Sequence, residues 1–520
     1  WILGPYSFIY SSDEAETLVP LIMYLARQHD GGRFAHGIAG GIDIYSVVTT
    51  TPFVSLEVLL YRGLPPWLAT ACQKVAVVGL GFSGAYLLAR RVGGADRLTA
   101  VALALNYTLA HRYMLQSSVH GGVSYSIGAM ALYLFVGRIQ KPNYWAGIGG
   151  VSVTHAISTT PTLAAPALAF ALLLGWFATG ARHPGRFAMA ILALAGVALA
   201  NWGETMFAVL QTASESHLIS RDVGTDLSIL PLRLYKYFDI GRSPEAAVII
   251  VSSLAVLLMV RSPRFLPSLT ILAIANGLGP VLLVVPWDEF GLGALRGYDY
   301  FYLNFALAPL SILAGAWAGA SALQKVRLRH ALQVVFLALA LGQFAWLKAF
   351  NVASWIGLGG ETVFTAYSNL SDRTWAPSHP FRVVTIPYRL SPNITATYGL
   401  ESFDGAVSNY QLNRAQFWAD SFPATAFAIR GGLTYVTNHE AMDVLCCRTY
   451  ELERYVDIDR LRLGNVEYIV SDLPLHHKDI VLVSGPATGT VPPRRGDTMR
   501  EKITGLATRL FSETPAYIYK

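Results

Sequence analysis

Two adjacent carboxylates near the start of the chain are the first residues with the chemistry of a catalyst. Asp13 and Glu14 stand in "SSDEAETLVPLIMYL", directly after the apolar stretch "WILGPYSFI". A carboxylate at a membrane boundary can act as a general base when its surroundings tune its pKa, and its oxygens can also bind a divalent cation. The position also suits a helix cap, because Ser12 or Asp13 precedes a helical pattern. Reaction and capping are compatible, so both roles stay open.

Other ionisable residues stand where apolar segments end. They are Asp43 in "GIAGGIDIYS", Arg112 and His120 in "HRYMLQSSVHGG", His155 in "THAISTTP", Glu204 in "NWGETMF", Arg233 in "LPLRLYKY", and Arg296 and Asp299 in "LGALRGYDY". Such groups are costly at membrane depth and usually face a cavity or a partner. A single histidine is more often structural, but all these residues fall on one side of the predicted membrane. We therefore expect an outward-facing cavity for a polar, anionic group, in which the arginines bind a phosphate.

A glycine motif in "VAVVGLGFSGAYLLARR" has the G-x-G-x-x-G spacing of a nucleotide-binding turn, at Gly79, Gly81 and Gly84. A dinucleotide-binding fold also needs a second strand that ends in an acid about 20 residues later. The segment at that distance, "TAVALALNYTLAH", is apolar and contains no acid. We therefore predict that these glycines lie within a helix and let a neighbouring helix approach closely.

The composition indicates a membrane protein that crosses the bilayer many times. Hydrophobic residues make up 53% of the chain and charged residues 14%, against about 25% charged residues in a typical soluble domain. Residues 1–9 look like the end of a helix that starts before Trp1, which makes about eleven spans in all. The other apolar blocks lie at 67–89, 98–113, 122–137, 144–156, 162–179, 186–202, 245–260, 267–286, 303–323 and 331–349.

Basic residues set the expected orientation. Every second loop carries Arg and Lys, and Asp96 is the single acid in those loops. The positive-inside rule makes these loops cytoplasmic and places segments 10–66, 203–244 and 350–520 outside. The net charge of +6 is then explained by membrane topology, and we predict no nucleic-acid partner.

The last part of the chain, 350–520, reads as an α/β domain outside the cytoplasm. "FRVVTIPY", "LTYVTN", "VEYIVSD" and "DIVLVSG" have the pattern of short strands, and "NRAQFWADSF" and "TMREKITGLATRLF" that of helices. Residues 1–349 form the predicted membrane domain, including outer loops 10–66 and 203–244. We expect Glu401 and Asp404 to be surface or loop residues. The three cysteines show no metal-binding spacing, so no metal site is predicted.

These features together resemble the GT-C superfamily of membrane glycosyltransferases, and more narrowly the bacterial YfhO-like membrane proteins. The resemblance rests on the acidic opening "SSDEAETLVPLIMYLARQ", the turn and helix start "GIAGGIDIYSVVTTTPFVSLEVLL", and two tail segments, "FRVVTIPYRLSPNITATYGLESFDGAVS" and "LRLGNVEYIVSD". They cover about a fifth of the chain, and their order carries more weight than any single motif. Family members often have a lone Asp where this chain has Asp13–Glu14.

The resemblance implies a multi-pass enzyme of the bacterial plasma membrane that transfers a sugar outside the cytoplasm. The donor would be a polyprenyl-phosphate sugar in the membrane lipid, and the acceptor a glycan, lipid or cell-wall polymer. Asp13 would deprotonate the acceptor hydroxyl, cations would stabilise the leaving phosphate, and one direct displacement would invert the anomeric centre. The superfamily permits a divalent cation without requiring one.

Two other functions fit parts of the sequence. A transporter or flippase of a lipid-linked sugar would need polar groups through the full membrane depth, and the blocks at 246–260 and 305–323 are nearly uninterrupted apolar sequence. A non-enzymatic scaffold of the cell envelope would explain the tail. It would not explain the ionisable residues at the outer helix ends, so glycosyl transfer is the favoured function.

Overall fold

The computed structural model describes most of the apolar blocks and parts of the three segments predicted to lie outside the membrane. The described residues are 14, 18–28, 33–46, 54–109, 114, 119, 121–159, 161–212, 230–231, 252, 255–256, 260–292, 301–322, 326–358, 368–372, 374–386, 393–405, 428–430, 433–435, 450–451, 456–471, 474–485 and 516–520.

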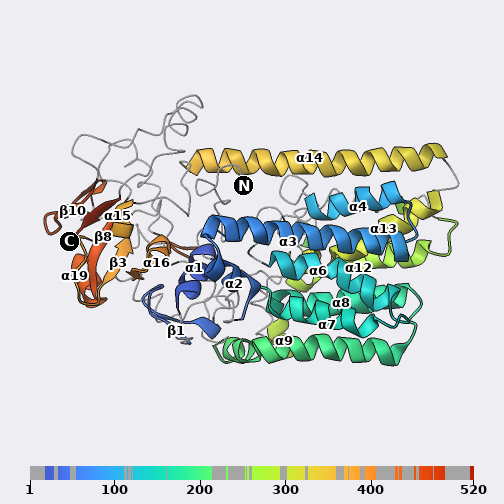
Figure 1. The fold of residues 1–520 in the computed structure, drawn as a ribbon, viewed down its shortest axis with the longest axis horizontal. Helices are drawn as coiled ribbons and strands as arrows, with labels where there is room; N and C mark the ends of the chain where they lie inside the picture. The colour runs from blue at the N-terminus through green and yellow to red at the C-terminus, as the bar shows by residue number, and fades with distance from the viewer. Residues whose placement is uncertain are drawn as a thin grey trace.

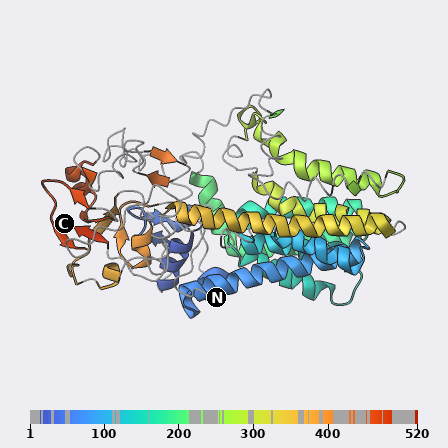
Figure 2. The same cartoon turned by 90° about the horizontal axis from the view of Figure 1, so that it is seen from above.

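The protein is mostly helical, and helices occupy the predicted apolar blocks. The block at 245–260 lies largely outside the described residues. The helices are α3 Pro66–Leu87, α4 Arg97–Leu109, α6 Gly122–Leu132, α7 Tyr144–Ala156, α8 Pro161–Ala178, α9 Pro184–Thr212, α12 Phe265–Leu283, α13 Phe301–Ala322 and α14 Val326–Leu358, and the π-helical turns η4 Leu88–Val92 and η5 Tyr133–Gly137 extend α3 and α6. These helices run side by side along the long axis of the molecule (Figures 1 and 2).

Among the described residues, four helical stretches are long and apolar enough to cross a membrane, which fits a membrane protein. They are Pro66–Val92, Pro184–Ala208, Phe265–Leu283 and Arg327–Ala349. Three shorter apolar helices lie at Gly122–Gly137, Ala164–Ala178 and Leu307–Ser321. Helix α14 continues to Leu358, beyond the predicted end of the membrane domain at residue 349.

Two of the three motif glycines lie at close helix contacts, as predicted. A Cβ atom on Gly84 would stand 2.5 Å from the backbone nitrogen of Met130 on α6, and one on Gly81 would stand 2.9 Å from the sulfur of Met114. A Cβ on Gly79 would meet nothing within 4 Å. The motif therefore lies inside helix α3, where Gly81 and Gly84 permit close packing and Gly79 does not contribute to it.

The C-terminal part contains a five-stranded mixed sheet in the order β10-β11-β8-β3-β4. Its strands are β3 Arg382–Thr385, β4 Glu401–Ser402, β8 Val466–Ser471, β10 Leu482–Ser484 and β11 Tyr517–Tyr519. Strand β3 pairs in parallel with β4 and β8, whereas β11 pairs antiparallel with β8 and β10.

The short elements outside this sheet complete the description. They are β5 Ala428–Arg430 with β6 Leu433–Tyr435, β7 Tyr450–Glu451 with β9 Leu475–His476, and helices α15 Ser368–Asp372, α16 Ile394–Thr397 and α19 Ile458–Leu463. The four predicted strand segments each contain a strand, β3, β6, β8 or β10. The two predicted helices of the tail, 413–422 and 498–511, lie outside the described residues.

The described residues of segment 10–66, the predicted first outer loop, lie between the helical bundle and the sheet (Figures 1 and 2). This segment contains α1 Val19–Arg27, the small hairpin β1 Phe34–Ala35 and β2 Ile42–Asp43, the turn η3 Ile44–Ser46, and α2 Leu56–Gly63. Apolar residues of α1 share one buried cluster with Val384 and Ile386 of the sheet region and with Phe403. The loop assigned by sequence to the membrane domain therefore shares a core with the C-terminal sheet.

Backbone hydrogen bonds reinforce this contact at the glycine-rich turn "GIAGG". The amide of Gly40 donates to the carbonyl of Ser402 at 2.7 Å, and the amide of Ala39 donates to that of Asp404 at 3.2 Å. Asp404 is 7% exposed, and its carboxylate accepts hydrogen bonds from Thr385 and Ser402. Asp404 is therefore a loop residue, which is one of the two expected possibilities, but it does not lie at the surface, because its carboxylate is buried and bonds to Thr385 and Ser402.

The glycine contacts predict different effects for the same substitution on one helix. We expect Gly84→Ala to lower the free energy of unfolding by about 1–3 kcal/mol, because the new methyl group overpacks against the backbone of α6. Gly79→Ala is the matched control and should be neutral or stabilising by up to about 1 kcal/mol, since alanine favours a helix. Thermal unfolding of the purified protein in detergent checks this. Equal stability of the two variants would contradict the close contact.

Candidate functional site

Four of the ten residues predicted to act or bind have described side chains: Glu14, Asp43, His155 and Glu204. The other six, Asp13, Arg112, His120, Arg233, Arg296 and Asp299, lie outside the described residues. The structure brings Asp43 and Glu204 into one group and places Glu14 in another.

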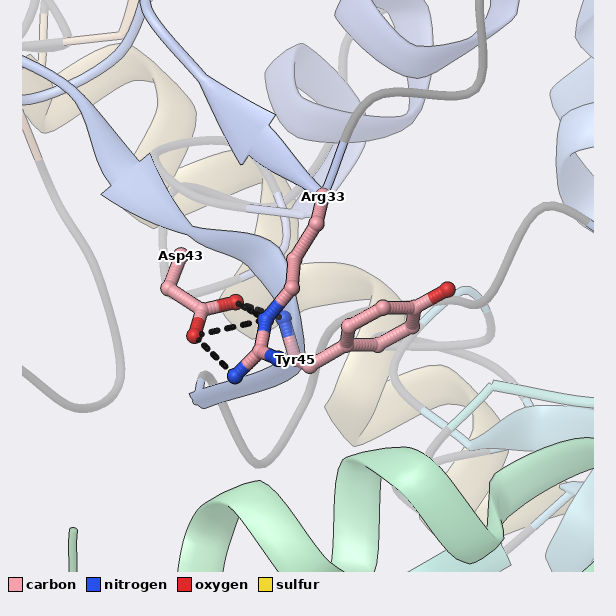
Figure 3. Close-up of polar contacts among 3 residues, drawn as sticks. All are labelled: Arg33, Asp43 and Tyr45. Carbon is pink, nitrogen blue, oxygen red and sulfur yellow. Dashed lines mark hydrogen bonds and ion pairs between the residues drawn. The ribbon is translucent and has the colours of Figure 1, made fainter.

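Asp43 forms a two-pronged ion pair with Arg33. The Nε of Arg33 lies 3.0 Å from each oxygen of Asp43, and its Nη2 lies 2.7 Å from Oδ2 (Figure 3). The guanidinium also lies over the ring of Tyr45, 5.6 Å from its centroid, and the amide of Tyr45 donates to Oδ1 of Asp43 at 3.0 Å. The hairpin positions the pair, because Phe34 and Asp43 face each other across β1 and β2.

Glu204, in the C-terminal part of α9, interacts with this group through Tyr45. Turn η3, which carries Tyr45, packs against α9. Partial burial raises the pKa of the Tyr45 phenol, and the negative charge of Glu204 and a hydrogen bond to it raise that pKa further. We refer to Arg33, Asp43, Tyr45 and Glu204 as the hairpin cluster.

Sequence reasoning found the two acids of the hairpin cluster and missed Arg33 and Tyr45. A signal was present, because "RFAHGIAGGIDIY" has a glycine-rich turn between short apolar runs, and folding it into a hairpin brings Arg33 near Asp43. The cluster remains accessible, since the Arg33 side chain is 59% exposed. One cation and two acids give it a surplus of negative charge, which suits the hydroxyl groups of a neutral ligand better than a phosphate.

Glu14 belongs to the interior of the protein. It is fully buried, and its Oε1 accepts a hydrogen bond from the amide of Val119 at 2.8 Å. A buried amide without a partner is costly, so this bond holds Glu14 against the turn before α6. The described part of the following helix, α1, begins at Val19 without a side-chain cap.

A second buried acid, Glu57, lies in the first turn of α2, which Ser55 caps by accepting from the amide of Val58. Its Oε1 lies 3.5 Å from the hydroxyl of Thr159, and that hydroxyl contacts the carbonyl of Val119 at 2.5 Å. Burial raises the pKa of Glu57 to about 7, although hydrogen bonds from Gln73 and Thr159 act in the opposite direction. Sequence reasoning overlooked Glu57, a lone acid in the apolar run "PFVSLEVLLY".

His155, near the end of α7, is fully buried. Neither of its ring nitrogens has a hydrogen-bond partner among the described residues. The neighbouring carbonyl of Ala156 accepts hydrogen bonds from Asn201 and Trp202 of α9, both at 2.7 Å. His155 thus lies inside the packed helices, whereas Asp43 and Glu204 lie in the partly exposed hairpin cluster.

Within the described ranges, no three side chains of His, Cys, Asp or Glu gather as metal ligands would. Comparison with known proteins gives no family assignment, since no protein-family model and no curated protein matches the chain. Functional inference therefore rests on the residues themselves.

The contact between Glu14 and Val119 predicts a difference between two substitutions. We expect Glu14→Ala to lower the free energy of unfolding by about 1–3 kcal/mol, because it leaves the Val119 amide buried without an acceptor. Glu14→Gln keeps an oxygen that can accept from this amide, so it should lower the free energy of unfolding clearly less than Glu14→Ala does. Chemical denaturation in detergent measures both. A Glu14→Gln variant as unstable as Glu14→Ala would show that the charge matters more than the hydrogen bond.

Proposed function

We propose that this protein is a membrane glycosyltransferase that moves a sugar from a polyprenyl-phosphate carrier to a glycan, lipid or cell-wall acceptor outside the cytoplasm. The proposal follows from the resemblance to the GT-C superfamily and to YfhO-like membrane proteins. The observation that carries it is the hairpin cluster, in which Asp43 and Glu204, distant in sequence, meet through Arg33 and Tyr45.

The hairpin cluster has the groups that recognise a sugar. Carboxylate oxygens accept hydrogen bonds from sugar hydroxyls, and the guanidinium donates to them. The ion pair holds Arg33 and Asp43 in a fixed relative orientation, so fewer rotamers have to be ordered when a ligand binds. We assign the hairpin cluster to binding the transferred sugar or the acceptor.

Asp13 is our candidate for the general base. Its neighbour Glu14 is buried and bonded to the Val119 amide, so Glu14 anchors the segment and leaves Asp13 for the acceptor hydroxyl. Arg112, Arg233 and Arg296 are the proposed cations for the leaving phosphate, whose charge grows in the transition state. Direct displacement by the activated hydroxyl inverts the anomeric centre.

The proposed topology has about eleven spans, with the basic loops in the cytoplasm of a bacterial cell. The first outer loop and the C-terminal α/β domain then lie together outside the plasma membrane. Their common buried core supports this part of the proposal, because two segments that share a core must lie on the same side of the bilayer.

The same common core favours one alternative function, a non-enzymatic scaffold of the cell envelope. In that case the sheet and the outer loop would form a rigid binding surface, and the hairpin cluster would be a structural ion-pair group. Activity measurements on variants separate the two functions.

Asp13→Asn tests the assignment of the base. We expect it to lower the rate of sugar release from a panel of polyprenyl-phosphate hexoses by about 10²–10⁴-fold, the usual contribution of general base catalysis. Glu14→Gln is the control and should keep most of the activity. Full activity in Asp13→Asn together with a large loss in Glu14→Gln would reverse the two roles. If both variants kept full activity, catalysis by Asp13 or Glu14 would have no support.

Substitutions in the hairpin cluster test the binding assignment. We expect Asp43→Asn to raise KM about tenfold or more with a smaller change in kcat, since one strong polar contact contributes about 1.5–3 kcal/mol. Its effect on unfolding should stay below about 1 kcal/mol, as for other exposed ion pairs. An unchanged KM would assign the cluster to structure alone.

A further inference from the structure

Glu57 is a buried acid, and the groups that act most on its pKa are neutral. After burial itself, the groups that act most on its pKa are its own backbone, the side chain of Gln73 and both the backbone and the hydroxyl of Thr159. Its other oxygen, Oε2, is buried and has no hydrogen-bond partner in the part of the chain that the structure describes. An ionised carboxylate with an unpaired oxygen in such a place is strongly disfavoured relative to the neutral acid.

The protons available at Thr159 lead to the same conclusion. A hydroxyl has one proton to donate and two lone pairs to accept with. The carbonyl of Val119 lies at 2.5 Å and the Oε1 of Glu57 at 3.5 Å, so the proton of Thr159 goes to Val119. The hydroxyl also accepts from the amide of Gly121 at 3.0 Å. One lone pair remains, and Glu57 can pair with it only by donating a proton of its own.

Tyr61, a described titratable residue that interacts with Glu57, does not stabilise a charge on it. Tyr61, on the same helix, feels the charges of both Glu57 and Glu14. Its phenol lies 2.5 Å from the hydroxyl of Thr70, which itself donates to the carbonyl of Pro66. Tyr61 must therefore donate its proton to Thr70. Ionisation of Glu57 would thus add a second buried carboxylate around Tyr61 without a new donor to compensate it.

We propose that Glu57 keeps its proton in mildly acidic solution, where an exposed glutamate is ionised, and donates it to Thr159, acting as a positioning residue for the turn that holds Glu14. The proton completes a chain of contacts from α2 through Thr159 to Val119 and Gly121, and from Val119 to Glu14. Loss of the proton removes the bond to Thr159 and loosens this turn. This chain of contacts does not depend on the proposed catalytic activity, so it is testable without an activity assay.

Infrared spectroscopy of the purified protein tests the protonation directly. At pH 6, between the ordinary glutamate pKa of 4.5 and the value of about 7, the spectrum of the wild type minus that of Glu57→Gln should show the carbonyl band of a protonated acid. This band should disappear as the pH rises past about 7. Glu289→Gln, at an exposed acid, is the matched control for the effect of a Glu-to-Gln substitution on the spectrum. Carboxylate bands alone in the difference spectrum of Glu57→Gln would overturn the proposal.

A second variant tests whether Thr159 accepts the proton of Glu57. It also replaces the first test if Glu57→Gln does not fold. Thr159→Val removes the hydroxyl, so the acid band that titrates near pH 7 should shift to the higher frequency of an acid without an acceptor. No shift would show that Thr159 does not receive the proton.

The pH dependence of unfolding adds an independent readout. The pKa of Glu57 is raised on folding, so its contribution to stability is full below pH 4.5 and is lost as the pH rises to about 7. The Tm of the wild type should therefore fall relative to that of Glu57→Gln over this range. The protection factor of the Gly121 amide, which corrects for the intrinsic rise of exchange with pH, should fall in the wild type alone. A difference in Tm between the wild type and Glu57→Gln that does not change with pH would contradict this role of Glu57.

Discussion

The end of the helical bundle that faces the sheet depends on one constraint: polar groups that have left water must find partners inside the protein. The hydroxyl of Ser124 contacts that of Ser158 and donates to the carbonyl of Thr159 at 2.9 Å. The Thr159 hydroxyl in turn donates to the carbonyl of Val119 and accepts from the amide of Gly121. Each of these segments connects helices, and a connection without such partners would leave backbone groups unsatisfied in a dry environment. The carboxylates of Glu14 and Glu57 are part of this network.

The same requirement joins the outer loop to the sheet. The turn at Ala39 and Gly40 donates its amides to carbonyls beside β4, while Ser402 donates its own amide to the carbonyl of Gly37. Glycine is needed at Gly405, because a Cβ there would stand 2.8 Å from that of Ala39. Apolar burial then adds the non-directional part of the attraction. The loop and the sheet therefore behave as parts of one packed unit.

The two groups of acids have different physical roles because their exposure differs. The hairpin cluster is partly solvated, so its ion pair contributes little to stability and its polar groups are available to a ligand. Glu14 and Glu57 are fully buried, and any change in their charge is costly. Binding is therefore expected at the first group and control of shape at the second. Segment 10–66 contributes residues to both groups: Arg33, Asp43 and Tyr45 to the hairpin cluster, and Glu14 and Glu57 as the buried acids.

The sequence by itself determined the helical blocks, the strand segments β3, β6, β8 and β10, and the helical role of Gly81 and Gly84. Hydrophobic length and alternation are local properties, so a pattern of residues is enough to predict them. It also supplied Asp43 and Glu204 as candidate ligands, since acids at the ends of apolar segments are rare and conspicuous. Eleven spans, the outward orientation and sugar transfer stay predictions.

Tertiary structure alone decided which residues meet. The pairing of Arg33 with Asp43 depends on the register of a hairpin, and the link from Tyr45 to Glu204 depends on where η3 packs against α9. The burial of Asp404 and of Glu57 depends on contacts between segments hundreds of residues or several helices apart. Burial and proton sharing are properties of a three-dimensional neighbourhood, and the residue types along the chain do not encode them locally.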